Sequence, residues 1–161
     1  MKLFKAFMAA VLLSFALMAG TVSASDSAPA DAKGPVLVEQ AGPEPDVGIQ
    51  GFFDPSFLYL DQGDNSIVNN GNQTITINVT TIAKQTVNSI GATIFFDWWN
   101  GSSWVELNST LISDANKKIF GGYATFSAPA GYYYRARTVH WVNHNGVFEQ
   151  GVRVTATVLA T

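Results

Sequence analysis

Strict alternation of side-chain polarity is the feature that most constrains the fold of this chain. Apolar residues occupy every second position from Ile75 to Val79 and again from Ile90 to Trp98. Successive side chains of a β-strand point to opposite faces, so this period of two predicts strands with one buried face. Most of the apolar positions carry β-branched or aromatic residues, which strands favour. The two segments therefore predict two strands.

Turn-forming residues divide the remaining sequence into further strands. Sequences containing Asn-Gly occur at 69–72, 100–101 and 145–146, between apolar runs, where hairpin turns need residues that tolerate positive φ. The Asn145-Gly146 pair is the clearest of the three. Further strands are predicted near 57–60, 104–112, 119–127, 132–142 and 147–159. No segment after residue 24 shows a convincing helical period.

About seven short strands in roughly 110 residues predict an all-β fold. We expect an antiparallel β-sandwich of immunoglobulin or fibronectin type III character, with a small barrel as the alternative. The segment SAPAGYYYRAR lies where such sandwiches place a tyrosine corner, in which a tyrosine hydroxyl bonds back to the backbone. If Arg135 and Arg137 face solvent, alternation puts Tyr134, Ala136 and Thr138 on the core face.

The first 24 residues have the composition of a secretory signal peptide. Lys2 and Lys5 form a positive start, residues 6–17 are apolar, and residues 22–24 (Val-Ser-Ala) form a small-residue cleavage site. A retained membrane anchor is the alternative, but the apolar run is short for a membrane span. We therefore expect a secreted protein, either extracellular or associated with the cell envelope.

The rest of the chain divides into a leader and one domain. Residues 25–50 are rich in Ala, Pro and Gly and lack aromatics, which predicts a flexible leader, and residues 51–161 form the predicted β-sandwich domain. Without the signal peptide, seven basic and twelve acidic residues remain, a net charge of about −5. This sign argues against a nucleic-acid partner or an anionic membrane. The chain has no cysteine, which excludes disulfides and thiol chemistry.

Three segments of the domain carry a family resemblance: WNGSSWVEL at 99–107, GYYYRARTVHWV at 131–142 and NGVFEQGVRVTATV at 145–158. In these segments the chain resembles a family of small secreted β-sandwich proteins of unknown function from spore-forming Gram-positive bacteria. The resemblance spans about residues 70–160, with Ala136 standing where that family tends to have a larger aliphatic residue. It implies the fold and a bacterial source, and it implies no chemistry.

Candidate metal ligands are few and poorly placed. His140 and His144 share one face of a predicted strand, but four strand residues separate them by roughly 13 Å. A zinc ion bonds to nitrogen at about 2 Å, so one metal cannot join them without a sharp bend. Asp61, Asp64 and Asn65 offer oxygen ligands of the kind that calcium takes, without EF-hand spacing. An acidic turn is the preferred interpretation, and we predict no metal site.

Catalytic motifs are missing from the sequence. It contains no GxSxG or HExxH motif. A glycosidase would need two carboxylates across the sheet, and Asp97 with Glu149 is the pair that predicted strands supply. Two solvent-facing strand residues are the preferred interpretation of these acids. We therefore predict a protein that is not an enzyme and uses no cofactor.

Outward-facing aromatics and arginines are the best candidates for a binding site. If Trp98 packs in the core, alternation sends Trp99 to the opposite face, and Trp141 lies on the arginine side of its own strand. Flat aromatic rings beside polar side chains stack on sugar rings or on apolar partner surfaces. Cross-strand aromatic pairs that only stabilise the sheet are the alternative. The predicted binding residues are Trp99, Tyr133, Arg135, Arg137 and Trp141.

These observations predict a secreted, non-catalytic binding module at the cell envelope or in the extracellular matrix. Its expected partner is a cell-wall glycan or an extracellular protein. One alternative is a structural protein that self-assembles through exposed strand edges, because such edges pair readily with neighbours. A hydrolase that uses the carboxylates of Asp97 and Glu149 is the remaining alternative.

Overall fold

The computed structural model describes residues 42–43 and 51–161. All described residues belong to one compact unit. The predicted signal peptide lies outside the described residues, as does the leader apart from residues 42–43. In the described part of the chain, no helix is long and apolar enough to cross a membrane.

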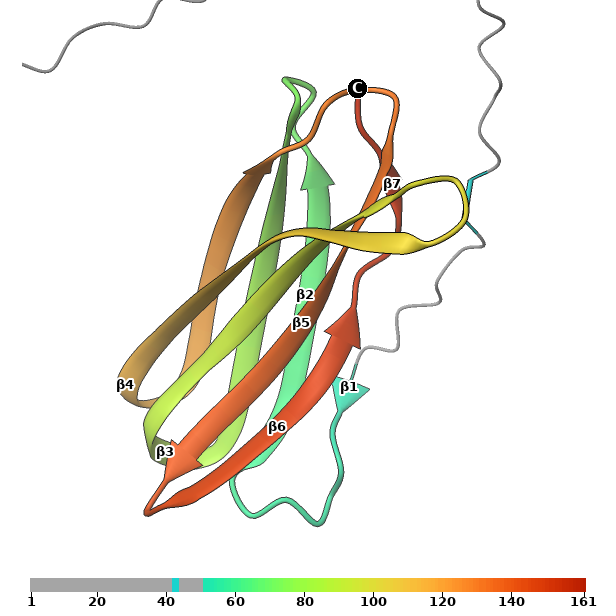
Figure 1. Cartoon of the computed structure of the whole chain (residues 1–161). Coiled ribbons are helices and arrows are strands. Elements are labelled where there is room, and N and C mark those ends of the chain that lie inside the picture. Colours follow the sequence, from blue (N-terminus) through green and yellow to red (C-terminus); the bar gives the residue numbers. More distant parts are fainter. Residues whose placement is uncertain (1–41, 44–50) are drawn as a thin grey trace, which may run out of the picture. The chain divides into compact units, whose positions relative to one another are not determined.

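Seven strands form one antiparallel sheet in the described residues, which confirms the predicted all-β, antiparallel fold (Figure 1). The sheet curls into a half-barrel. The strands are β1 (Gly51–Phe52), β2 (Leu60–Asn69), β3 (Thr74–Trp99), β4 (Trp104–Ser127), β5 (Tyr133–His144), β6 (Val147–Val154) and β7 (Val158–Leu159).

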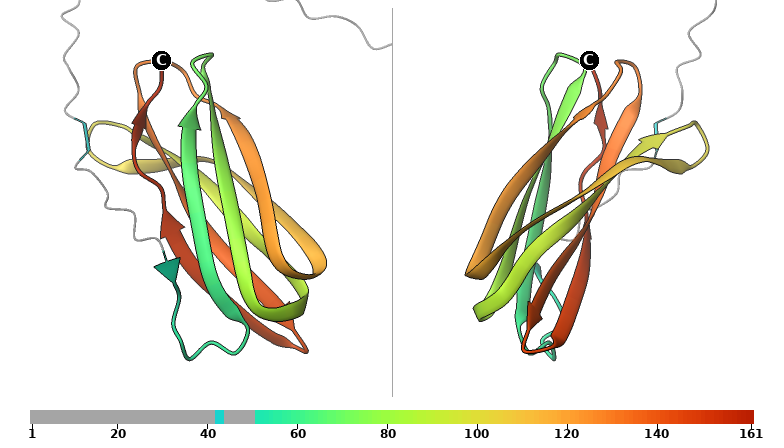
Figure 2. Two further views of the ribbon diagram at one scale, coloured as in Figure 1. Left: turned by 180° about the vertical axis from the view of Figure 1, so that it is seen from behind. Right: turned by 60° about the vertical axis from the view of Figure 1, so that its left-hand side comes forward.

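The long strand β3 links the two halves of the curled sheet. Its first half pairs with β2, from Asn69↔Ile75 to Leu60↔Ala83, and its second half pairs with β5, from Ser89↔Asn143 to Trp98↔Tyr134. β4 follows β3 along both halves, with a register shift between Ile82 and Val87. Figure 2 shows how both long strands bend and pass from one half to the other.

β3 runs unbroken where two separate strands are predicted from the sequence, and so does β4. Neither connecting stretch contains proline, and the register shift between Ile82 and Val87 lets the paired backbones bend there while both strands continue. The three predicted hairpin turns are present. Asn145 and Gly146 both have positive φ, 51° and 83°, as the two central residues of a type I′ turn require.

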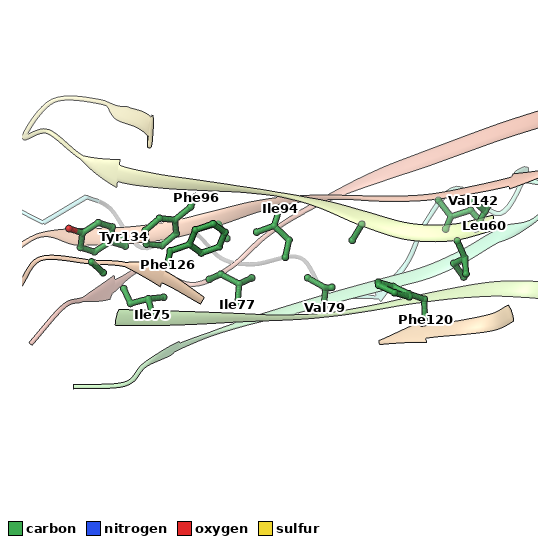
Figure 3. Close-up of a cluster of buried hydrophobic side chains, with 14 of the residues drawn as sticks. Leu60, Ile75, Ile77, Val79, Ile94, Phe96, Phe120, Phe126, Tyr134 and Val142 are labelled. Carbon is green, nitrogen blue, oxygen red and sulfur yellow. The ribbon is translucent and has the colours of Figure 1, made fainter. Parts of the chain in front are cut away.

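The core lies between the two halves of the sheet, where inward side chains meet (Figure 3). The ring of Phe96 stacks on Phe126 with centroids 4.7 Å apart, and on Tyr134 with centroids 5.1 Å apart. Ile75 and Ile77 reach the same core from the first half of β3 and are fully buried. Alternation therefore predicted which face of β3 is buried in both of its halves.

Tyr134 forms the predicted tyrosine corner. Its ring is buried, and its hydroxyl donates a hydrogen bond to the carbonyl oxygen of Pro129 at 3.1 Å. Ala136 and Thr138 are also buried on the core face, as the outward placement of the two neighbouring arginines implied. Desolvation raises the pKa of the Tyr134 phenol. The phenol is therefore a neutral hydrogen-bond donor at physiological pH.

Glu149 of β6 joins the two borders of the curled sheet. Its carboxylate accepts backbone hydrogen bonds from Leu58, Tyr59 and Leu60, at 2.5, 2.8 and 2.7 Å. Burial opposes ionisation of this carboxyl, but the three backbone donors outweigh it and hold its pKa below the usual value. The chain that enters β2 is thus tied to β6 through one ionised side chain.

Arg153, four residues further along β6, makes a second tie to the same border. Its guanidinium donates to the carbonyl oxygens of Gly63 at 3.0 Å and Phe52 at 3.1 Å. Its Cζ also lies 4.0 Å from the ring centroid of Phe53, within the range of a cation–π contact. Among the described strands β6 pairs only with β5, so side chains hold it against β2.

Replacement of Glu149 with alanine should therefore destabilise the fold. The change leaves three backbone N–H groups without their charged acceptor, which should lower the free energy of unfolding by about 2–4 kcal/mol. Urea denaturation followed by tryptophan fluorescence measures this loss. Glu106→Ala is the matched control, because the Glu106 side chain is 44% exposed and should cost less than about 1 kcal/mol. Equal losses in the two variants would contradict the role of Glu149.

Candidate functional site

All five predicted binding residues lie on the outward face of the sheet formed by β5 and the second half of β3. The register sets Arg135 opposite Asp97, Arg137 opposite Phe95, and Trp141 opposite Gly91. Alternation along each strand places Trp99 and Tyr133 on this same face. We call this surface, with the adjoining outward residues of β4 and β6, the outer face.

A buried carboxylate organises one end of the outer face. Asp97 is only 3% exposed, and its Oδ2 accepts a hydrogen bond from Arg137 Nε at 2.9 Å. Arg135 Nε lies 3.5 Å from the same oxygen. Arg137 also donates to Glu106 Oε2 at 3.0 Å, and its hydrogen bonds to Asp97 raise its pKa despite partial burial. The two guanidinium groups are thereby held in fixed positions.

Aromatic rings flank both arginines. The Cζ of Arg135 lies 4.4 Å from the ring centroid of Trp104, and that of Arg137 lies 4.9 Å from the centroid of Phe95. Trp104 also meets Trp99 edge to face across the β3–β4 turn, with centroids 5.4 Å apart. These contacts are of the cation–π and aromatic-pair kinds. Rings and charges together form a fixed polar and aromatic platform.

Trp141 belongs to a second, more apolar part of the outer face. It lies four residues along β5 from Arg137, roughly 13 Å away. Its ring stacks on Phe148 of β6 with centroids 6.0 Å apart, and Phe148 is 55% exposed. Val152 of β6 and Leu111 of β4 are also exposed on this face. The five predicted residues thus share a face but divide between two clusters.

Several residues of this site are not predictable from the alternation of a single strand. Four residues of the outer face were not among the predicted binding residues: Phe95, Trp104, Glu106 and Phe148. Each comes beside a predicted residue through cross-strand register, which a single strand's alternation does not determine. The signal that could have found Phe95 is its spacing of two from Asp97.

The interpretation of Asp97 and Glu149 as solvent-facing residues is wrong for both acids, and so is their pairing as a catalytic couple. Asp97 pairs in register with Arg135, whereas Glu149 pairs with Val142. Seven residues of β5 separate these positions, roughly 23 Å. The carboxyls of a glycosidase lie about 5–10 Å apart. Each carboxylate is bound to its own donors, so the two cannot act on one bond.

His140 is a buried core residue with a defined tautomer. The Thr81 hydroxyl donates to the carbonyl oxygen of Gly91 at 3.1 Å, so it accepts from His140 Nδ1 at 2.8 Å. The other ring nitrogen, Nε2, is buried and has no hydrogen-bond partner among the described residues. Desolvation, and then the positive charge of Arg153, lower the pKa of His140 from 6.5 to about 4. The imidazole is therefore neutral at physiological pH.

His144 is the last residue of β5, four residues beyond His140. Its Nδ1 accepts from the backbone N–H of Asn88 at 3.2 Å, and its ring meets Tyr59 edge to face. The two histidines make contacts with different groups. No group of three or more His, Cys, Asp or Glu residues that could hold a metal ion occurs in the described ranges.

The predicted oxygen ligands near the start of β2 point to different sides of the sheet. Asp64 accepts a hydrogen bond from the side chain of Gln62 at 2.9 Å. The side chain of Asn65 is buried and donates to the Thr138 hydroxyl at 2.9 Å. Because neighbouring strand residues face opposite ways, Asp64 and Asn65 cannot share one calcium ion. These residues belong to a strand, where the sequence predicted a turn.

No protein-family model, curated protein or solved structure matches the chain. The resemblance to secreted proteins of spore-forming bacteria therefore stays a prediction.

Removal of the Asp97 carboxylate should destabilise the protein more than removal of Glu106, although both bind Arg137. Asp97→Ala leaves two partly buried guanidinium groups without their shared acceptor, so we expect a loss of about 2–4 kcal/mol in unfolding free energy. Glu106→Ala removes one exposed ion pair and should cost less than about 1 kcal/mol. Urea titration of both variants measures the difference. A larger loss for Glu106→Ala would contradict the central role of Asp97.

The buried His140 should make the protein less stable in mild acid. The unfolded chain takes up a proton near pH 6.5, but the folded imidazole does so only near pH 4, so stability is present above pH 6.5 and falls as the pH drops toward 4. Between pH 7.5 and 5 this difference amounts to about 2 kcal/mol. Urea unfolding at both pH values measures it. His140→Leu should flatten the pH dependence, whereas His144→Gln should retain it; retention in both variants would contradict this assignment.

Proposed function

We propose that this chain is a secreted, non-catalytic binding module that acts at the cell envelope or in the extracellular matrix. The observation that carries the proposal is the outer face, where a buried Asp97 fixes two arginines among exposed or half-exposed aromatic rings. Such a surface is pre-organised. Because its side chains are already held in place, they lose little conformational freedom when a ligand binds. The N-terminal sequence, with its signal-peptide composition, supports export.

The pairing of β3 supports a fold of fibronectin type III character within the proposal. One half of the sheet contains β1, β2, the first half of β3 and the second half of β4. The other contains β6, β5, the second half of β3 and the first half of β4. Their inward faces share one core. This pairing supports a two-layer sandwich in which two strands pass between the layers.

A carbohydrate polymer of the envelope is the ligand that this surface favours. Sugar rings have apolar faces that stack on aromatic rings and hydroxyl edges that bond to polar groups. Trp141 and Phe148 supply adjacent rings, and Arg137 with Glu106 supplies charged groups on the same face. The net charge of about −5 on the chain without its signal peptide disfavours polyanionic ligands such as nucleic acids.

A polymer pull-down tests this function. Residues 25–161 are incubated with insoluble peptidoglycan, chitin or cellulose, and the bound fraction is measured as a function of protein concentration. We expect retention on at least one polymer and a loss of about tenfold in affinity for Trp141→Ala/Phe148→Ala, because a ring that stacks on a ligand contributes about 1 kcal/mol or more.

The control is Phe52→Ala/Leu58→Ala, which removes two exposed apolar side chains away from the outer face. It should bind as the unmodified chain does, and circular dichroism verifies the fold of each variant. Retention that survives Trp141→Ala/Phe148→Ala would move the site off this part of the face. Absence of retention on all three polymers would contradict the carbohydrate ligand and favour an extracellular protein as partner.

A further inference from the structure

β4 has one unpaired edge along its whole length. The strand has 24 residues and pairs only with β3 among the described strands. Its second half lies at the border of the sheet in all three ribbon views (Figures 1 and 2). The backbone N–H and C=O groups on the outer side of such a strand are available to another strand. This edge is separate from the outer-face clusters, so the inference does not rest on the proposed function.

The second half of β4 lacks the protection that exposed edges usually carry. Natural edges are blocked by charged residues, proline or bulges. The charges of β4 include Asp114, Lys117 and Lys118, which gather at the bend between its halves. Residues 119–127, with the sequence IFGGYATFS, contain neither charge nor proline and pair with β3 without a register shift. An uncharged, regular edge of this kind is suited to pairing.

Two residues of this edge are incompletely covered: the space above Gly121 is empty, and the side chain of Tyr123 is largely exposed to solvent. Tyr123 is 70% exposed, the highest exposure of any large apolar or aromatic residue of β4. Gly121 lies two residues away on the same side of the strand, and a Cβ built there would meet nothing within 4 Å. A groove of about 600 Å³ is lined by Phe120–Tyr123 and by Leu111–Ser113 of the first half of β4, and Leu111 among these residues also belongs to the outer face.

We infer that a second copy of this chain pairs with this edge, antiparallel and centred on Gly122. In this register Gly121 lies opposite the partner's Tyr123, and Tyr123 lies opposite the partner's Gly121. Each exposed ring then covers the open space above a glycine, a cross-strand pair known to stabilise sheets. Ile119 lies opposite the partner's Thr125, which shields a side chain that is 58% exposed in the single copy.

The charges agree with this pairing and with a second copy as the partner. Lys117 and Lys118 lie opposite the partner's Ser127 and Phe126, so no like charges face one another. The segment is therefore complementary to itself. A two-fold pairing uses the edge of residues 119–127 in both copies, so no such edge remains for a third copy. A partner of another sequence would gain the backbone hydrogen bonds, but nothing in the register selects it.

Sedimentation velocity of residues 25–161 tests the inference. A single edge contact is smaller than a standard protein interface, so we expect reversible dimers over roughly 5–500 µM. Gly121→Lys/Tyr123→Lys places lysines opposite lysines at both pairs and should abolish the dimer. Both positions are open to solvent, so the monomer should keep its fold, as circular dichroism verifies. Phe52→Lys, at another exposed position, is the control and should dimerise normally.

Charge complementation tests the register itself. Gly121→Glu/Tyr123→Glu should also be monomeric, and an equimolar mixture of the lysine and glutamate variants should form a heterodimer, because each pair then joins opposite charges. Dimers of the unmodified chain together with this rescue support the inference. A chain that stays monomeric to 500 µM overturns it, as do dimers that survive the lysine variant and a mixture that fails to associate.

Discussion

The curl of the sheet depends on a border that is closed by side chains. β2 and β6 come together where the sheet turns over, yet neither pairs with the other through its backbone. Glu149 binds three backbone N–H groups before and at the start of β2, and Arg153 binds two carbonyl oxygens of β1 and β2. Phe53 fills the space between them, since a Cβ at Gly63 or Gly151 would collide with its ring. These contacts hold the inner faces together and allow the core between them to be buried.

Alternation predicted much of the fold because burial in a half-buried strand follows a period of two. The inward placement of Tyr134 and the outward placement of Arg135 and Arg137 are confirmed, as are the three hairpin turns. The continuity of β3 was not predicted, because alternation marks faces and does not show where a strand bends. Pairing between distant strands also left no local signal, so the contact of Glu149 with residues 58–60 could not be anticipated.

The sequence predicts the side of the sheet on which the candidate site lies, but it does not predict the contacts between the residues of that site. Each tryptophan and arginine could be assigned to a side of its strand, but the partner of each ring depends on cross-strand register. Asp97 illustrates the difference: as a strand acid it was expected in solvent, and it is buried because two arginines of the neighbouring strand neutralise it. A buried charge requires such partners, and one strand read alone does not reveal them.

The two proposed surfaces together have a geometric consequence. In an antiparallel strand pair the two-fold axis runs perpendicular to the sheet, so pairing through the second half of β4 keeps equivalent faces of both copies on one side. The outer face lies on the other half of the curled sheet, and the same axis turns both outer faces in the same direction. A dimer would then present two binding surfaces toward one plane, such as an insoluble polymer. When one outer face of the dimer is bound to the polymer, the other is held close to it at a high effective concentration. The overall affinity of the dimer then exceeds that of either face alone.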